Sequence, residues 1–154
     1  MRTTLLFLFC LVIACALSSQ AQTVSVLGGN QVLSITTAVT GSEPTAVVNT
    51  ASTVRYRRQS FVITKLTVST SCPSQQFTLK VYASSIQANG GTAAPEVTLT
   101  NGMPATDFIT SIPRFSTQYR TATLRYTASA TFAQGNSTEF GNDVHTVTYT
   151  LVRQ

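Results

Sequence analysis

Few side chains in this sequence could carry out chemistry, and the candidates lie far apart along the chain. His145 is the only histidine, and it stands two residues after Asp143 in a stretch that alternates like a β-strand. A catalytic triad needs a nucleophile, a base and an orienting acid that meet in space. A structural zinc site needs four ligands, which Cys72 and His145 cannot supply alone. We therefore predict no catalytic residue, no metal site and no cofactor, and interpret His145 as a solvated or edge-strand side chain.

Two other enzyme classes find no support in the sequence. The carboxylates show no paired spacing of the kind that glycosidases use; they are Glu43, Glu96, Asp107, Glu139 and Asp143. The stretches GGN and NGG, which begin at Gly28 and Asn89, lack the strand-to-helix setting of a phosphate-binding loop. An enzyme is therefore the least favoured class of function.

Basic residues are concentrated in RYRRQ, from Arg55 to Gln59. Interleaved basic and aromatic side chains suit a surface for nucleic acid, but basic residues also protect the edge strand of a sheet from unwanted pairing. The chain has ten basic and five acidic residues, and removal of a leader that contains Arg2 would leave a net charge of 9 − 5 = +4. Because this excess is small, we favour a protected edge strand and predict no nucleic-acid partner.

The first residues of the chain predict export. Arg2 precedes the apolar run LLFLFCLVIACAL, from Leu5 to Leu17, and the small residues of SSQA follow. This order describes a secretory signal peptide, so we predict a signal peptide over 1–21 and one mature domain over 22–154. The alternative is a lipoprotein that carries its lipid on Cys15. No later segment is apolar over the length that a membrane span requires, and we expect a secreted, periplasmic or cell-surface protein.

Cys72 is the only cysteine of the mature domain, because Cys10 and Cys15 belong to the signal peptide. A disulfide within one mature chain is therefore excluded. Cys72 is either a small buried apolar residue or a thiol that pairs with another molecule, and we favour burial.

The mature sequence predicts β-structure almost throughout. Segments rich in Thr, Ser and Val alternate with turns that contain Gly, Asn and Pro, and no window keeps a helical apolar stripe. The predicted strands are Thr23–Leu27, Gln31–Val39, Ser60–Ser69, Gln76–Ser84, Glu96–Thr100, Asp107–Ile112, Tyr119–Phe132 and Asp143–Val152. Short strands with regular turns indicate an antiparallel sandwich. We predict an all-β fold, a single immunoglobulin-like or Greek-key β-sandwich.

Alternation within the strands predicts the core. The expected inner residues are Phe77, Leu79, Val81 and Ala83 in one strand, and Ala122, Leu124, Tyr126, Ala128, Ala130 and Phe132 in another. In the last strand Val147, Tyr149 and Leu151 alternate with Thr146, Thr148 and Thr150. We expect the apolar set to face the core, or a groove that a partner strand completes.

The spacing at the C-terminus supplies a resemblance. Counted back from Gln154, Leu151, Tyr149 and Val147 are fourth, sixth and eighth, and Gly141 is fourteenth. This pattern resembles that of chaperone–usher pilus subunits and, more distantly, of spore-coat-U-like subunits. The chain departs from the family at Arg153, where an aromatic residue is usual, and in lacking the usual pair of cysteines.

The resemblance implies an incomplete immunoglobulin-like sandwich whose last strand borders an open groove. A periplasmic chaperone would fill the groove first, and the N-terminal extension of the next subunit would replace it. Val24 and Val26, in Thr23–Leu27, have the alternation that a donor strand needs. The alternative is that Thr23–Leu27 is the first strand of a complete sandwich.

From these observations we expect a structural subunit of a bacterial surface filament or coat, which associates with itself or with a protein partner at the cell surface. The alternative is a binding or adhesion module for a glycan or another surface ligand. Such a module would need exposed aromatic side chains, and Tyr56, Tyr82 and Tyr119 are the candidates.

Overall fold

The computed structural model describes residues 22–58, 62–114, 118–135 and 137–154. The predicted signal peptide over 1–21, and with it the alternative lipid site at Cys15, lies outside these residues. Among the residues described, no helix has the length and apolar character needed to cross a membrane.

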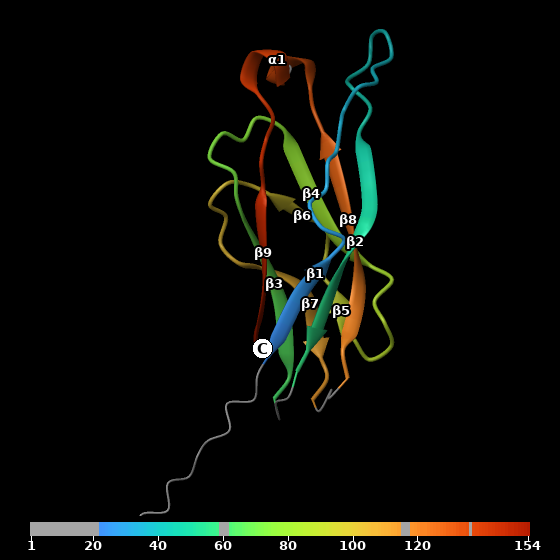
Figure 1. Ribbon diagram of the computed structural model, residues 1–154, viewed down its shortest axis with the longest axis vertical. Helices are drawn as coiled ribbons and strands as arrows, with labels where there is room; N and C mark the ends of the chain where they lie inside the picture. Colours follow the sequence, from blue (N-terminus) through green and yellow to red (C-terminus); the bar gives the residue numbers. More distant parts are fainter. Residues whose placement is uncertain (1–21, 59–61, 115–117, 136) are drawn as a thin grey trace, which may run out of the picture.

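The described residues form two antiparallel sheets that pack face to face (Figure 1). The first sheet has the strand order β1 (Thr23–Leu27), β2 (Val47–Arg57), β8 (Arg120–Ser129), β4 (Thr78–Ser84) and β6 (Val97–Leu99). The second has the order β5 (Thr92–Ala93), β7 (Thr106–Ile112), β3 (Thr64–Ser71) and β9 (Thr146–Arg153). A 3-10 turn (Phe132–Gln134) and the single-turn helix α1 (Ser137–Phe140) lie between β8 and β9. The predicted all-β antiparallel sandwich is confirmed.

The connections alternate between the sheets. After β2, each strand lies in the opposite sheet from the strand before it. An immunoglobulin-like sandwich has strands in the order A-B-E-D in one sheet and C-F in the other. Here β1-β2-β8-β4 take the first order and β3-β9 take the second. The strands β5, β6 and β7 are additional and lie in sequence between β4 (strand D) and β8 (strand E). In that fold a strand G lies beside strand F. No strand of the described residues takes this place, so β9 forms the edge of its sheet.

The core lies between the inner faces of the two sheets. In β8, which pairs with β2 on one side and β4 on the other, Ala122, Leu124 and Tyr126 are buried. These residues were expected inside. Successive side chains of a strand point to opposite faces, so the apolar residues can leave water while the polar residues between them stay on the outer face. The prediction was wrong for Phe132, which is 60% exposed because β8 ends at Ser129 and the chain turns there.

A tyrosine pair connects the sheets. The hydroxyl oxygens of Tyr126 in β8 and Tyr149 in β9 are 2.9 Å apart, and one hydroxyl donates to the other. The ring of Tyr149 also packs against Phe108 of β7, with 5.2 Å between ring centroids and 52° between planes. The two phenol groups can thus be buried together because they share a hydrogen bond, in which one hydroxyl donates and the other accepts.

The strand prediction was wrong for two long segments, and it also missed the two-residue strand β5. Gln31–Val39 forms no strand, although its side chains alternate in exposure from Gln31 to Thr36 and Leu33 packs against the core. Val47–Arg57 was missed, yet it is the longest strand of the described chain and lies between β1 and β8. A shift in pairing between Asn49 and Ser52 interrupts the alternation of this strand, so its sequence lacks a regular period of two.

Candidate functional site

The edge strand β9 is the first candidate for a functional site. It pairs with β3 along its whole length, from Thr146 opposite Ser71 to Arg153 opposite Thr64. No described strand is hydrogen-bonded to its other side. The stretch from Thr146 to Val152 contains no charged residue, no proline and no glycine. Such an edge presents N–H and C=O groups that can accept a further strand.

The two faces of β9 differ as the sequence predicts. Tyr149 and Leu151 are buried, and the partly buried Val147 packs against the core. Thr146, Thr148 and Thr150 are exposed. Burial raises the pKa of Tyr149 above its usual value, and the contact with Tyr126 raises it further. The predicted orientation is therefore confirmed, and Tyr149 is a neutral, buried anchor of this strand.

Gly141 lies where the chain leaves α1 and turns towards β9. It has a φ of +80°, a left-handed conformation that glycine adopts readily and that commonly ends a helix. A Cβ atom at Gly141 would meet nothing within 4 Å. The structure thus requires glycine there for its backbone conformation and not for space.

The strand β1 lies beside this edge. It pairs with β2 through five residue pairs, from Thr23 opposite Arg57 to Leu27 opposite Thr53, and it approaches β9 on the same side of the sandwich (Figure 1). Val24 packs against the core, whereas Val26 is 44% exposed. In this structure Thr23–Leu27 therefore extends the sheet of its own chain.

A second candidate site is formed by Cys72, Asp143 and His145. Each can offer one ligand atom, and these atoms all lie within 4.8 Å of one another. Cys72 directly follows β3. His145 directly precedes β9 and Asp143 lies two residues before it, so the pairing of these strands brings the three residues together. The third ligand could not be recognised from the sequence, because the position of Asp143 relative to Cys72 depends on that pairing.

The electrostatic environment of this cluster favours its neutral forms. Burial raises the pKa of the Cys72 thiol, and the Asp143 carboxylate raises it further. Burial lowers the pKa of His145, and Asp143 opposes this effect. Cys72 is 1% exposed, which confirms that it is buried and not a surface thiol for pairing with another molecule.

Gln59 lies outside the described residues, and the remainder of the basic stretch, Arg55–Arg58, does not lie on an edge strand, so that prediction was wrong. It begins in β2, an inner strand of its sheet. Tyr56 is buried and donates its hydroxyl proton to the Gly90 carbonyl oxygen at 2.6 Å, and burial raises its pKa to about 12. The fully buried Arg58 donates through Nη1 to the carbonyl oxygens of Ile112 (3.3 Å) and Pro113 (3.1 Å).

The remaining guanidinium groups of this stretch cover an aromatic ring. The Cζ atoms of Arg55 and Arg57 lie 3.6 Å and 4.8 Å from the centroid of the Tyr119 ring. These are cation–π distances. Of the three tyrosines expected to be exposed, Tyr56 is buried, and Tyr82 and Tyr119 are partly buried.

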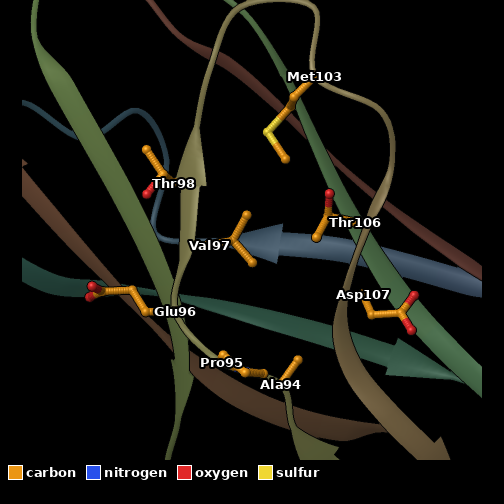
Figure 2. Close-up of a pocket in the computed structure, with 8 residues that line it drawn as sticks. All are labelled: Ala94, Pro95, Glu96, Val97, Thr98, Met103, Thr106 and Asp107. Atoms are coloured by element: carbon orange, nitrogen blue, oxygen red, sulfur yellow. The ribbon is translucent and has the colours of Figure 1, made fainter.

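An open depression of about 430 Å³ lies between β6 and the start of β7, on the side of the sandwich away from β9 (Figure 2). Val97 and Met103 point into it, whereas Glu96 and Thr98 point away. Its lining contains no aromatic and no basic residue. The depression therefore lacks the groups that would hold a sugar ring or an anion.

Comparison of the chain with protein-family models, curated proteins and solved structures found no significant match. The functional interpretation therefore rests on the geometry of β9, β1 and the Cys72 cluster.

Proposed function

We propose that this protein is a secreted structural subunit of a bacterial surface filament or coat, and that it joins its neighbours by donor-strand addition at β9. The observation that carries the proposal is the position of β9. This strand has eight residues and a regular inner and outer face, and no described strand pairs with its outer backbone edge.

Strand addition requires a backbone edge and pockets for alternate side chains. The edge of β9 meets the first requirement because its groups directed away from β3 are free to pair with another chain. The position beside β9 is also the place of strand G in an immunoglobulin-like sandwich. An added strand there would cover Val147, which the described chain leaves only partly buried. The second sheet would then be completed by another molecule.

The donor that we propose is Thr23–Leu27 of a neighbouring subunit. Within its own chain this segment is held by one short ladder to β2, and residues 28–46 connect the two strands without a helix or a strand. Because one short ladder holds it at the end of a long connection, this strand can leave its own sheet at a modest cost and pair instead with β9 of a neighbour. Val24 and Val26 would supply the alternate apolar side chains. A periplasmic chaperone that covers β9 before assembly belongs to the same proposal.

The test compares mature protein, residues 22–154, with a variant that lacks 22–27. We expect the mature protein to form polymers in size-exclusion chromatography with light scattering. The deletion variant should remain folded by circular dichroism, stay monomeric and bind a peptide of residues 22–30. The double substitution Val24→Ser and Val26→Ser should also prevent assembly, whereas the control Ser25→Ala should not.

Two results would contradict the proposal. The mature protein could remain a stable monomer at high concentration, which would leave β9 unused. Alternatively, the deletion could unfold a monomeric protein, which would show that Thr23–Leu27 serves only the sandwich of its own chain.

A glycan-binding module is the less supported alternative. Tyr56 is buried, and Tyr119 lies under two guanidinium groups. The depression between β6 and β7 has no aromatic lining. Of the three tyrosines, this leaves Tyr82, a partly buried ring. The exposed rings of Phe132 and Phe140 lie between β8 and β9, outside the depression.

A further inference from the structure

The cluster of Cys72, Asp143 and His145 combines a sulfur, an oxygen and a nitrogen ligand. These are the three ligand types that zinc takes in proteins. The ligand atoms lie within 4.8 Å of one another, whereas neighbouring ligand atoms of a tetrahedral zinc ion are about 3.3–3.6 Å apart. Small side-chain rotations that contract the cluster by little more than an ångström would meet that geometry.

The hydrogen bonds of His145 leave one ring nitrogen available. Nδ1 lies 3.2 Å from Oγ1 of Thr70, and this hydroxyl also donates to the carbonyl oxygen of Thr146 at 3.4 Å. The tautomer that satisfies both contacts carries the ring proton on Nδ1 and donates it to Thr70, because the hydroxyl has one proton and gives it to Thr146. Nε2 is left as an acceptor, and it is buried without a hydrogen-bond partner among the described residues. A buried, unpartnered nitrogen costs free energy unless a proton donor or a metal ion reaches it.

The other two ligands are held in place by the backbone. The Asp143 carboxylate accepts from the N–H of Gln76, at 2.9 Å to Oδ1, and from the N–H of Phe77, at 2.8 Å to Oδ2. A carboxylate offers about four lone-pair positions, so it can still bind a cation. The backbone N–H of Cys72 donates to Oδ1 of Asn101 at 2.8 Å, which fixes the backbone at Cys72. Such outer contacts orient the ligands of protein metal sites.

We propose that Cys72, Asp143 and His145 bind a zinc ion, with a water molecule as its fourth ligand. Zinc requires the thiolate of Cys72, so binding of the ion would release the thiol proton. Thr70 acts as a positioning residue through its bond to Nδ1.

Zinc at this position would join the end of β3 to the beginning of β9. Cys72 and Asp143 are 143 − 72 = 71 residues apart in sequence, so the ion would close a long loop in a domain that has no disulfide. The site would thereby hold the register of the edge strand β9. This inference is independent of the proposed function, because it concerns the stability of one chain.

The test uses mature protein, residues 22–154, with Zn²⁺ and Co²⁺ as probes. We expect one equivalent of Zn²⁺ to bind in equilibrium dialysis, and a hundredfold excess over the Kd to raise the Tm by about 10 °C. The Co²⁺ form should show a thiolate-to-cobalt charge-transfer band and the intense visible bands of tetrahedral cobalt. A chelator should reverse both effects.

Substitutions identify the ligands. His145→Gln and Asp143→Asn should each weaken Zn²⁺ binding by more than about a hundredfold, and Thr70→Val should weaken it by about 10–100-fold, the range for outer contacts. Cys72→Ser should abolish the charge-transfer band. Asp107→Asn is the matched control, because Asp107 pairs with Lys65 at 2.6 Å on β7 and should leave binding unchanged.

The proposal would be overturned if the folded protein bound no stoichiometric Zn²⁺, or if its Co²⁺ form lacked the charge-transfer band. It would also be overturned if His145→Gln and Asp143→Asn, shown by circular dichroism to be folded, bound Zn²⁺ as tightly as the parent. These two variants keep the test decisive even if Cys72→Ser fails to fold.

Discussion

The four-stranded sheet has two very different edges. One edge is β9, a strand of eight residues, and the other is β5, a strand of two residues. On the same side as β5, the five-stranded sheet ends in β6. This strand has three residues and follows Pro95 and Glu96. Glu96 also lies 3.7 Å from the ammonium group of Lys80. Short strands, proline and charge all prevent an edge from pairing with another chain.

The comparison shows that edge protection in this protein is local. The β5–β6 side uses several of the known devices. The sequence of β9 contains no proline and no charge between Thr146 and Val152, and β1 approaches this strand without pairing with it. An unprotected edge of this length is a site of aggregation unless another strand covers it. The contrast therefore favours a specific partner for β9.

The largest predicted effect is on the buried anchor of the unprotected side. Tyr149→Ala removes a large buried ring and leaves the hydroxyl of Tyr126 without its partner. We expect a loss of about 3–5 kcal/mol in the free energy of unfolding, by analogy with Phe→Ala in cores, out of a typical 5–15 kcal/mol. Urea denaturation measures this loss.

Two substitutions sharpen that result. Val97→Ala, in the short edge strand β6, should cost about 0.5–3 kcal/mol, and Thr148→Ala, on the outer face of β9, only a few tenths. If Tyr149→Ala cost no more than Val97→Ala, β9 would not be anchored as the structure indicates.

The next largest predicted effect is a loss of stability at alkaline pH. It concerns Tyr56, whose hydroxyl lies near the β5–β6 side. Tyr56 donates to Gly90, in the connection between β4 and β5, and burial raises its pKa from 10 to about 12. Between these values the folded state binds more protons than the unfolded state, so stability falls as pH rises. Two pKa units correspond to about 2.7 kcal/mol, a loss that is complete only above pH 12.

Urea titrations at several values between pH 9 and 12 measure this dependence. Tyr56→Phe should flatten the curve, although it loses the hydrogen bond to Gly90. The pKa of Tyr149 and that of Tyr126 are also raised by burial, so the variant should keep part of the alkaline loss. A curve that does not change in Tyr56→Phe would assign the whole effect to the β9 side.

The smallest effect on stability should be the largest on assembly. Thr148→Lys places a charge on the exposed face of β9 and should change the free energy of unfolding by only a few tenths of a kcal/mol. Because lysine on an edge opposes strand pairing, we expect it to reduce polymer formation in light scattering. Thr98→Lys, on the protected strand β6, is the matched control and should assemble normally. Equal assembly of both variants would break the comparison between the two edges.

Local alternation was sufficient to predict much of the fold. The strands β1, β4, β8 and β9 were expected near their observed positions, as were the two faces of β9. In contrast, the paired strand β2 has irregular alternation around its bulge, and its basic residues suggested an exposed edge. Gln31–Val39 alternates in sequence but forms no ladder, because alternation describes a face and does not specify a pairing partner.

The two candidate sites, β9 and the Cys72 cluster, also differ in how far the sequence predicts them. The inner residues of β9 could be predicted because they are neighbours in sequence. The meeting of Cys72 with Asp143 and His145 could not, because it depends on the pairing of β3 with β9 in a register that only the folded chain defines. The burial of Arg58 is a third case, since its carbonyl partners at Ile112 and Pro113 lie more than fifty residues away.

The alternation of consecutive strands between the two sheets has a kinetic consequence. After β2, no strand can form a hairpin with the next one, so folding must close loops that enclose at least one whole strand. Chains dominated by such distant contacts fold in milliseconds to seconds, far more slowly than helical bundles. β9 pairs with β3 and lies last of the described strands, so a chain that has not finished folding would expose the apolar faces of both until the domain closes. During that interval it could pair with other unfolded copies. We therefore expect the refolding yield of the isolated protein to fall steeply with concentration, and to recover when another protein shields these strands.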